Sequence, residues 1–570
     1  MKSLSFLAVG LFSGALAATV SQDATCGGTN KYTCLGSQFG NCCSSAGWCG
    51  STTAYCGTGC QSGFGNCGSN NGPSSTVASS TKAPSSTKAS SATPAPSASG
   101  SATQCLSDKK VPYKVSADAA YAQLAEPYNL RLPYKPAVIV LPTTNQHVQD
   151  AVVCGGKAGL KIQAKSGGHS YASFSSGGKD GSMVIDLEPF QTVALDKTSG
   201  VVQVGGGVRL GNLADGIYTQ GKRALSHGTC PGVGVGGHAT HGGYSHTSRS
   251  WGLAMDAITA ADVVLANGTL VKASSSQNSE IYWGIRGAAE SLGVITTFYM
   301  QTRAAPESVT YFAIPWTGIF NSKATFTNSF LRLQEIARNS SIIDDRISFG
   351  VYVDNYGTFS LSGAFFGSVS EFNSKIKGEF LRNMPTSGEV TVKPYSWYDY
   401  LILVAGKDSI KEPLTGYSEH DTFFAKSLTV PEKDGLSSAA LDAFYTYSQT
   451  ASSKSVEFYS IINLYGGPGS TINKKDTNFA AYADRDSLWV FQNYGQGANT
   501  VSFMNGLQDA VIKAQPQTQF GAYLNYVDPS YDAATAHKLY YGDALYARLL
   551  ALKKAVDPKN VFWNPQSIGA

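Results

Sequence analysis

Eight of the eleven cysteines fall within residues 26–67, and this cluster constrains the chain more than any other feature. About forty residues cannot bury a hydrophobic core large enough to fold alone, so cross-links must hold the segment together. A zinc site is the alternative, but eight sulfurs in a secreted chain favour disulfides. Spacing alone leaves roughly a hundred pairings open. We therefore expect a small disulfide-bonded unit.

Residues 1–17 have the pattern of a secretory signal. A lysine precedes a short apolar run, and small residues stand before a cleavage point after Ala17. No later segment reaches about 20 uninterrupted apolar residues, so we expect no membrane contact. The sequence predicts a secreted, extracellular glycoprotein, with acceptor triplets at Asn267 and Asn339.

A composition shift separates the cysteine cluster from the rest of the chain. Residues 69–104 are rich in Ser, Thr, Pro and Ala without apolar periodicity, which predicts an extended, O-glycosylated linker. The whole chain is only 14% charged and carries a formal net charge of +4. This balance gives no reason to expect a nucleic-acid partner.

Beyond the linker, strand and helix patterns alternate in an α+β arrangement of two lobes. Residues 137–141 predict a strand, and Thr144 caps a helix whose apolar residues share one face. Residues 262–272 predict a hairpin with Asn267-Gly268 as a type I′ turn. Further strands are expected at 160–164, 201–204, 309–315, 347–353 and 359–366.

The cysteine cluster contains CCSSAGWCG over residues 42–50, followed by Tyr55-Cys56. This pattern resembles the hevein-type chitin-binding module, which would span residues 24–68. The resemblance implies the disulfides Cys26–Cys43, Cys34–Cys49, Cys42–Cys56 and Cys60–Cys67.

The same resemblance implies a sugar-binding surface. Trp48 and Tyr55 take the positions whose rings stack on N-acetylglucosamine, and Ser44 takes the position of the hydroxyl that holds the N-acetyl group. The family often has another aromatic residue where Ala46 stands, so one stacking platform is missing. The alternative, that both rings form a core, fits poorly in so small a unit.

Three cysteines remain outside the cluster. Cys105 opens the large module and Cys154 lies on its first helix, so we expect a bridge between them. Cys230 then has no partner and lies in a glycine-rich segment, residues 228–243. Glycine density lets backbone N–H groups approach an anionic ligand. A buried, inert thiol is the alternative interpretation.

Three patterns lie near this thiol. Gly232-x-Gly234-x-x-Gly237 fits a dinucleotide fingerprint only formally, without a βαβ unit around it. The histidines of this region match no strong zinc spacing, so no metal is expected. His169 lies in a second glycine turn that directly follows a strand, which makes it a candidate for holding a cofactor.

An ordered set of motifs then resembles the berberine-bridge and glucooligosaccharide oxidase family over about residues 110–570. The motifs are KSGGHSY (165–171), VGGGVRLG (204–211), GTCPGVGVGGH (228–238), YWGIRGAAESLGVIT (282–296), YLNYVD (523–528) and NPQSI (564–568). The resemblance implies a two-lobed FAD fold of the PCMH, vanillyl-alcohol-oxidase type. An FAD-binding domain would span residues 105–305 (core 134–304) and 515–570, and a substrate lobe with an antiparallel sheet would span residues 306–514.

In that family a histidine and a cysteine both bond covalently to FAD. The matching residues are His169, at the flavin 8α-methyl group, and Cys230, at C6. The unpaired thiol thereby gains a role, and the redox chemistry belongs to the flavin. Further cofactor-binding residues implied by the motifs are Ser166, Gly167, Gly168, Ser170, Gly232, Val233, Gly237, His238, Gly293, Val294, Ile295, Asn564 and Gln566.

The resemblance also implies catalytic and substrate residues. Oxidation at C1 of a sugar needs a base for the O1 proton, and Tyr526 matches the catalytic tyrosine of the family. Asn463 stands where the oligosaccharide oxidases usually place a carboxylate, which alters how that base is activated. The implied sugar contacts are Tyr171, Gln492 and Tyr352.

These observations predict an FAD-dependent oligosaccharide oxidase that converts the reducing end to a 1,5-lactone. The resemblance also implies that the residue three past the flavin cysteine governs oxygen access; here it is Val233, the permissive choice, so O2 rather than another electron acceptor is expected. The attached module favours chitooligosaccharides, although a tether concerns location more than specificity. Gluco- or cello-oligosaccharide oxidase or dehydrogenase, secondary-metabolite oxidase and inactive chitin-binding protein are the alternatives. We expect a monomer.

Overall fold

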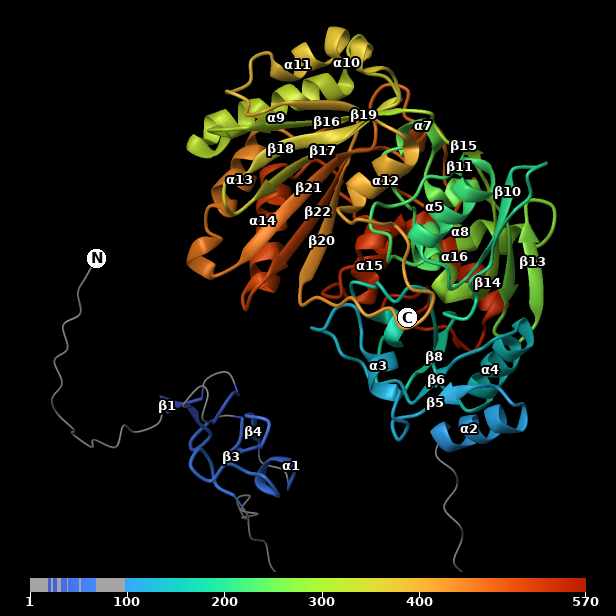
Figure 1. Cartoon of the computed structure of the whole chain (residues 1–570). Coiled ribbons are helices and arrows are strands. Elements are labelled where there is room, and N and C mark those ends of the chain that lie inside the picture. Colours follow the sequence, from blue (N-terminus) through green and yellow to red (C-terminus); the bar gives the residue numbers. More distant parts are fainter. Residues whose placement is uncertain (1–18, 22–23, 28–31, 38, 51–52, 68–97) are drawn as a thin grey trace, which may run out of the picture. The chain divides into compact units, whose positions relative to one another are not determined.

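The computed structural model describes residues 19–21, 24–27, 32–37, 39–50, 53–67 and 98–570 (Figure 1). The predicted signal and most of the predicted linker lie outside these ranges. The chain divides into two compact units, with the division after Thr93, and each is described by itself. None of the helices in the described ranges is long and apolar enough to cross a membrane.

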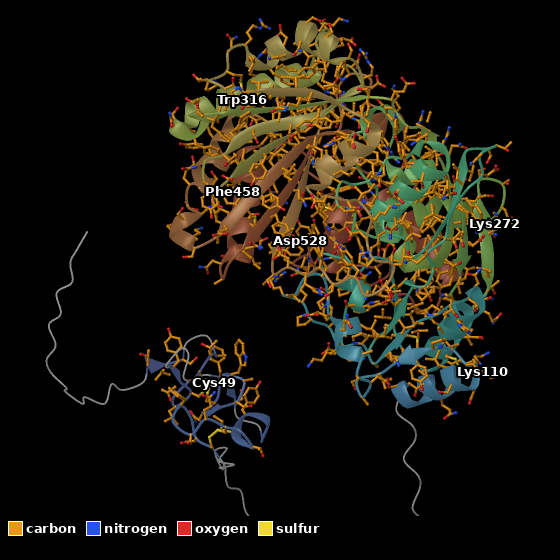
Figure 2. The ribbon with its side chains drawn as sticks, viewed as in Figure 1. Cys49, Lys110, Lys272, Trp316, Phe458 and Asp528 are labelled. Atoms are coloured by element: carbon orange, nitrogen blue, oxygen red, sulfur yellow. A yellow bond between two sulfur atoms is a disulfide. The ribbon has the colours of Figure 1, made fainter. Side chains whose placement is uncertain are left out.

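The small unit has very little regular structure and a core made largely of sulfur. Cys26, Cys34, Cys43 and Cys49 are buried together against Phe64, and sulfur appears near Cys49 in Figure 2. Its four disulfides are those that the hevein resemblance implies: Cys26–Cys43, Cys34–Cys49, Cys42–Cys56 and Cys60–Cys67. Its elements are β1 (Thr19–Val20), β2 (Tyr32–Thr33), β3 (Cys42–Cys43), β4 (Cys49–Gly50) and α1 (Thr53–Cys56).

The first lobe of the large unit contains two main sheets and a small antiparallel pair, β11 (Arg223–Ala224) with β15 (Arg303–Ala304). One is four-stranded, in the order β5-β6-β8-β7, and pairs β6, β8 and β7 in parallel. The other is five-stranded and antiparallel, in the order β13-β12-β14-β10-β9. The strands are β5 (Tyr113–Lys114), β6 (Val138–Val140), β7 (Ile162–Lys165), β8 (Met183–Asp186), β9 (Val193–Leu195), β10 (Val201–Gly205), β12 (Ile258–Val264), β13 (Leu270–Ser274) and β14 (Val294–Gln301).

Helices surround these two sheets, and the last ones come from the C-terminal end of the chain (Figure 1). The side chain of Thr144 accepts a hydrogen bond from the backbone of His147 and so caps α4. The disulfide Cys105–Cys154 joins α2 to α4. The helices are α2 (Ala98–Asp108), α3 (Tyr121–Ala125), α4 (Asn145–Lys157), α5 (Leu210–Gly221), α6 (Val235–Thr240), α7 (Ser248–Trp251), α8 (Ser279–Leu292), α15 (Ala533–Tyr540) and α16 (Gly542–Val556).

The second lobe is built on a seven-stranded antiparallel sheet, in the order β19-β16-β18-β17-β21-β22-β20. One face, with Trp316 and Phe458, packs into an apolar core that includes residues of α9, α13 and α14 (Figure 2). The strands are β16 (Val309–Trp316), β17 (Ile347–Asp354), β18 (Phe359–Phe365), β19 (Thr391–Tyr395), β20 (Phe424–Pro431), β21 (Glu457–Leu464) and β22 (Ser487–Gln496). The helices are α9 (Lys323–Arg338), α10 (Val369–Lys375), α11 (Lys377–Leu381), α12 (Trp397–Ala405), α13 (Ser438–Ser448) and α14 (Thr500–Ala514).

The opposite face of this sheet is the one that matters for the site, and strand periodicity determines its residues. Phe349 and Val351 of β17 point into the core, so Tyr352 points to the other face. Tyr352 pairs with Ile461, which pairs with Gln492 on β22. We call this surface the groove face; it also carries Asn463, Tyr459 and Tyr494.

Two expectations are corrected. Residues 98–104, assigned to the linker, are helical because α2 buries Ala102 completely in the core of this lobe. The hairpin between β12 and β13 is present, but its turn is not type I′. Of the pair Asn267-Gly268, only Gly268 has a positive φ, 83°. Its N–H bonds the Leu265 carbonyl, which makes a three-residue loop that ends in a left-handed glycine.

Candidate active site

A cavity of about 370 Å³ is lined mainly by residues of the first lobe, together with Ala405, Lys407 and Glu419 of the second. Its wall joins segments that are far apart in sequence: the turn after β7, the loop before α6, the end of α8, and the short helix Leu524–Tyr526. It is lined by all but one of the predicted cofactor residues: Ser166, Gly167, Gly168, His169, Ser170, Cys230, Gly232, Val233, Gly237, His238, Gly293, Ile295, Asn564 and Gln566.

Val294 is the exception. It is the first residue of β14 and its side chain packs into the apolar core beside Val264. Successive side chains of a strand point to opposite faces, so Val294 turns away where Gly293 and Ile295 face the cavity. The side chain of Val294 therefore does not line the cavity, and the assignment of this residue to cofactor binding stays a prediction.

The two glycine turns touch each other through their backbones. A Cβ atom on Gly167 would lie 2.2 Å from the backbone nitrogen of Gly234, so no side chain fits there. Arg209 holds the two turns together, because its Nη1 donates to the carbonyl oxygens of Gly167 (2.8 Å) and Gly232 (2.6 Å). The positions of His169 and Cys230 are thus fixed by one shared backbone contact.

His169 projects from the first turn into this wall. Its ring stacks on Tyr128 with centroids 4.2 Å apart, and its Nε2 lies 3.1 Å from the Tyr417 hydroxyl. Burial, and then the charge of Arg209, lower the pKa of His169 to about 3. The imidazole is therefore neutral at physiological pH, with one ring nitrogen that carries a free lone pair.

Cys230 is the single free cysteine among the described residues. Its thiol is accessible from the cavity, yet protein groups surround the cavity closely. This desolvation raises the pKa of the Cys230 thiol. Both candidate attachment residues thus reach the same cavity in their neutral forms.

The wall has the features needed to hold a large polar cofactor such as FAD. Gln566 Oε1 and Ser175 Oγ are buried, line the cavity and have no hydrogen-bond partner in the described structure. Nothing lies within 4 Å of a Cβ position on Gly237, so this backbone faces open space. Buried polar atoms without a partner can be satisfied by hydrogen bonds from a bound ligand, and the hydroxyls and amides of FAD offer both donors and acceptors.

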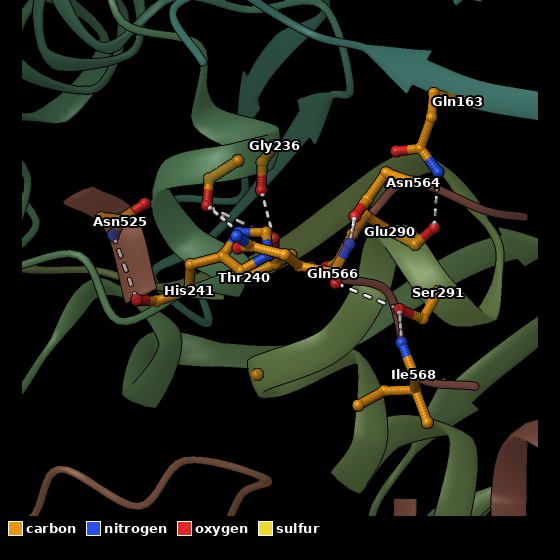
Figure 3. A network of polar contacts seen from close by, with 12 residues as sticks. Gln163, Gly236, Thr240, His241, Glu290, Ser291, Asn525, Asn564, Gln566 and Ile568 are labelled. Atoms are coloured by element: carbon orange, nitrogen blue, oxygen red, sulfur yellow. Dashed lines mark hydrogen bonds and ion pairs between the residues drawn. The ribbon is translucent and has the colours of Figure 1, made fainter. Parts of the chain in front are cut away.

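A buried ion pair forms another part of the wall (Figure 3). His241 Nε2 lies 2.6 Å from Glu290 Oε2, and Asn525 donates to the carbonyl oxygen of His241. Burial opposes both charges, but their attraction and hydrogen bond outweigh it; the pKa of His241 is raised and that of Glu290 lowered. His238 instead accepts the Gly228 N–H at 3.0 Å, and burial lowers its pKa to about 3.

At the mouth of the cavity, three predicted residues form a row. The ring of Tyr526 stacks on Tyr171 with centroids 5.7 Å apart. The Tyr171 hydroxyl in turn accepts a hydrogen bond of 2.8 Å from Gln492 Nε2 on β22. Burial, followed by neighbouring Tyr523, raises the pKa of Tyr526 well above its usual value.

Asn463 and Tyr352 lie farther along the groove face. In the described structure no hydrogen bond joins Asn463 to Tyr526; the Asn463 amide lies over Gly350, 2.7 Å from a Cβ position there. Tyr352 stacks on Tyr459 with centroids 5.8 Å apart. The structure therefore brings Tyr352 into the aromatic row of the groove face but not into contact with Tyr526.

The small unit has its own candidate site. Trp48 is 50% exposed, and its backbone N–H donates to Ser44 Oγ at 3.2 Å. Tyr55 packs over Gly50, the last residue of β4. Ser44 and Trp48 are thus in contact, and their grouping with Tyr55 into one binding surface stays a prediction.

Comparison with known proteins identifies the family. The family model described as "FAD binding domain" matches residues 136–274, and the model "Berberine and berberine like" matches residues 522–569. A xylooligosaccharide oxidase of Thermothelomyces thermophilus is 36% identical over 82% of this chain and 93% of its own length. The chain belongs to the berberine-bridge-like family of FAD oxidases. It is an FAD-dependent carbohydrate oxidase.

Two further relatives describe the cofactor and the substrate class. A chitooligosaccharide oxidase of Gibberella zeae is 36% identical over 82% of this chain and 94% of its own length. A solved glucooligosaccharide oxidase from Acremonium strictum, described with a 6-S-cysteinyl, 8α-N1-histidyl FAD, superposes with a TM-score of 0.77 at 30% identity. That match covers 82% of this chain and 99% of the other. FAD is therefore the cofactor, in a fold of the PCMH type.

Sequence reasoning missed several residues of the site. Arg209 stands inside the quoted motif VGGGVRLG, and its charge in a glycine turn was a usable signal. Glu290 and His241 also stand inside quoted motifs, but only the fold brings them together. Tyr417 comes from a loop of the second lobe without any motif, so no sequence signal pointed to it.

Proposed function

We propose that this oxidase acts on the reducing-end C1 hydroxyl of chitooligosaccharides and reduces O2 to H2O2. The observation that carries the proposal is the row of Tyr526, Tyr171 and Gln492, which links the flavin cavity to the groove face. A sugar that lies on this row places its reducing end against the cavity. An extended, aromatic groove face suits an oligomer better than a small compact metabolite.

His169 and Cys230 would hold FAD covalently from the two glycine turns, and the relative with a bicovalent flavin supports this assignment. The chemistry that bound FAD would supply is the acceptance of a hydride from C1 and the transfer of its two electrons to O2. Val233 lies in the cavity wall three residues past Cys230 and leaves room for O2.

Tyr526 would accept the O1 proton. Gln492 holds the Tyr171 hydroxyl, and these two groups offer polar contacts that orient the sugar. Because burial raises the pKa of Tyr526, its phenolate is scarce at neutral pH but strongly basic once formed. Loss of hydrogen from C1 with loss of the O1 proton gives the 1,5-lactone, which water opens to the aldonic acid.

The small unit would bind chitin through Trp48, Tyr55 and Ser44. An indole that is 50% exposed keeps much of its ring surface free to stack on a sugar. In the secreted full-length enzyme, this binding concentrates the oxidase on its substrate source. Trp48→Ala should weaken retention on chitin about tenfold through the lost stacking contact, while Phe39→Ala, another exposed ring of this unit, should not.

The test compares sugars by anaerobic bleaching of the flavin. N,N′-diacetylchitobiose, cellobiose and xylobiose are mixed with the enzyme without oxygen, and air is then admitted. Fastest bleaching by the chitin sugar, with prompt recolouring, supports the proposal. Faster bleaching by another sugar transfers the specificity to that sugar, and no bleaching by any of them favours a metabolite oxidase or an inactive chitin-binding protein.

A further inference from the structure

A chain of hydrogen bonds leads from His169 into the second lobe. The Tyr417 hydroxyl lies 3.1 Å from His169 Nε2 and donates to Glu419 Oε2 at 2.6 Å. Lys407 holds Glu419 in turn, with 2.6 Å between Nζ and Oε1, and also bonds Glu412 at 2.9 Å. These residues lie in the loop between α12 and β20, and the proposed sugar oxidation does not use them.

The direction of the bonds follows from chemistry. A carboxylate can only accept, so Tyr417 donates its single proton to Glu419 and its oxygen is left to accept from His169. Lys407 and Tyr417 overcome burial and lower the pKa of Glu419, whereas burial and the bond to Glu419 raise that of Tyr417. His169 is neutral, so its one proton lies on Nε2 and its lone pair on Nδ1.

The position of Tyr417 is built into the wall. The Arg209 guanidinium lies 3.7 Å from the centre of the Tyr417 ring, and the same guanidinium bonds both glycine turns. A Cβ atom on Gly232 would lie 1.8 Å from the Tyr417 hydroxyl oxygen. Only a glycine therefore admits this tyrosine beside His169.

We propose that Tyr417 and Glu419 fix the tautomer of His169 and take its Nε2 proton as Nδ1 bonds the flavin. This inference rests on the proposed attachment of FAD at His169. Tyr417 touches the reacting imidazole, and Glu419 acts through Tyr417 as a positioning residue.

The atoms and electrons of the step balance. Nδ1 gives its lone pair to a new bond with the 8α carbon of FAD, and that carbon loses one proton. The Nε2 proton passes through Tyr417 to Glu419. The electron pair of the broken C–H bond passes through the flavin to O2, the oxidant of the enzyme's own reaction, which takes up the two protons and becomes H2O2.

The experiment isolates the histidine bond. In a Cys230→Ala background, flavin that stays with the denatured protein reports attachment at His169 alone. Purified enzyme is denatured, and protein-bound and released flavin are measured by fluorescence and by the mass of the His169 peptide. Adding Tyr417→Phe should lower the ratio of attached to released flavin at least tenfold, because the proton acceptor is lost. Adding Glu419→Gln should act in the same direction.

Matched controls separate this role from a structural one. Tyr398→Phe removes a hydroxyl that bonds Asp215 at 2.8 Å, a similar tyrosine–carboxylate pair away from His169, and should leave the ratio unchanged. The Tyr417→Phe enzyme should still bind FAD without the covalent bond. Unchanged attachment in both variants would overturn the relay alone. Persistent covalent flavin after His169→Ala in the same background would instead overturn the attachment at His169.

Discussion

The cavity wall and the groove face meet at Tyr526, yet they are built in opposite ways. The wall is made of turns in which glycine backbones touch, as at Gly167 and Gly234. The side chain of Arg209 donates hydrogen bonds to both turns and so holds them together. The groove face is made of regular antiparallel strands, and every second side chain, such as Tyr352 and Gln492, points into the groove.

Because the two regions are built differently, a substitution should have different consequences in each. In the wall, an added methyl group collides with backbone, which cannot move without shifting a whole turn. On the groove face, an exchange of one side chain changes one contact and leaves the strand intact. Substitutions in the wall should therefore affect cofactor retention and stability, and those on the groove face should affect sugar binding.

Tyr526→Phe tests the meeting point and should have the largest effect. Loss of the phenol removes the acceptor for the O1 proton, so the rate of anaerobic flavin reduction should fall about 10³-fold. The flavin should stay bound, because Tyr526 makes no hydrogen bond that holds the wall in the described structure. Stopped-flow absorbance at saturating sugar measures the rate. Tyr445→Phe, on α13 behind the sheet, is the control. If the flavin of Tyr526→Phe were reduced as fast as that of Tyr445→Phe, Tyr526 would be excluded as the base.

Gly167→Ala should break the wall without touching the groove face. A methyl group 2.2 Å from the Gly234 nitrogen overpacks the contact between the turns, at a cost of about 3 kcal/mol, and flavin content should fall with it. Gly378→Ala on α11 is the matched control, because nothing lies within 4 Å of its Cβ position. Thermal melting and the flavin-to-protein absorbance ratio measure both effects. Equal flavin contents in the two variants would contradict the close contact of the turns.

Much of this wall could be predicted from the sequence. The glycine turns that carry His169 and Cys230 are local sequence motifs. Their glycines indicate that two backbones approach closely, as they do in the structure. The pairing of Cys105 with Cys154 likewise followed from counting. The orientation of the Val294 side chain, away from the cavity, could not be predicted from the motif, because a motif names consecutive residues whereas a strand presents only every second side chain to a cavity.

The long-range polar contacts that hold the cavity wall could not be predicted from the sequence. Tyr417 and Glu419 reach His169 from a loop more than two hundred residues away, and neither has a pattern around it. His241 and Glu290 become a pair only because α6 packs beside α8. The type I′ turn at Asn267-Gly268 failed for a local reason, since the same two residues also suit a longer loop with one left-handed glycine.

Gln492→Leu tests the groove face alone. It removes the 2.8 Å bond to the Tyr171 hydroxyl and an amide for the sugar, a loss of about 1 kcal/mol. KM for the preferred sugar should therefore rise about fivefold, with flavin content and melting temperature unchanged. Steady-state peroxide production measures it, and Gln301→Leu on β14 is the control. A loss of flavin in Gln492→Leu would show that the two regions are not separable.

Asn463→Asp tests whether the groove face can exchange a proton with Tyr526, and it should have the smallest effect. Burial raises the pKa of Tyr526, so the phenolate fraction, and with it flavin reduction in the native enzyme, should increase as pH rises across the neutral and alkaline range. An aspartate has the shape of Asn463 and can accept a proton through Tyr526.

Reduction at neutral pH should therefore increase a few-fold in Asn463→Asp, and the profile should level off above the carboxyl pKa and fall only when acid protonates that group. Reduction rates from pH 4 to pH 10 decide the matter. If the variant keeps the alkaline rise of the native enzyme, position 463 lies outside proton-transfer reach of Tyr526, and the groove face supplies binding contacts but no catalytic group.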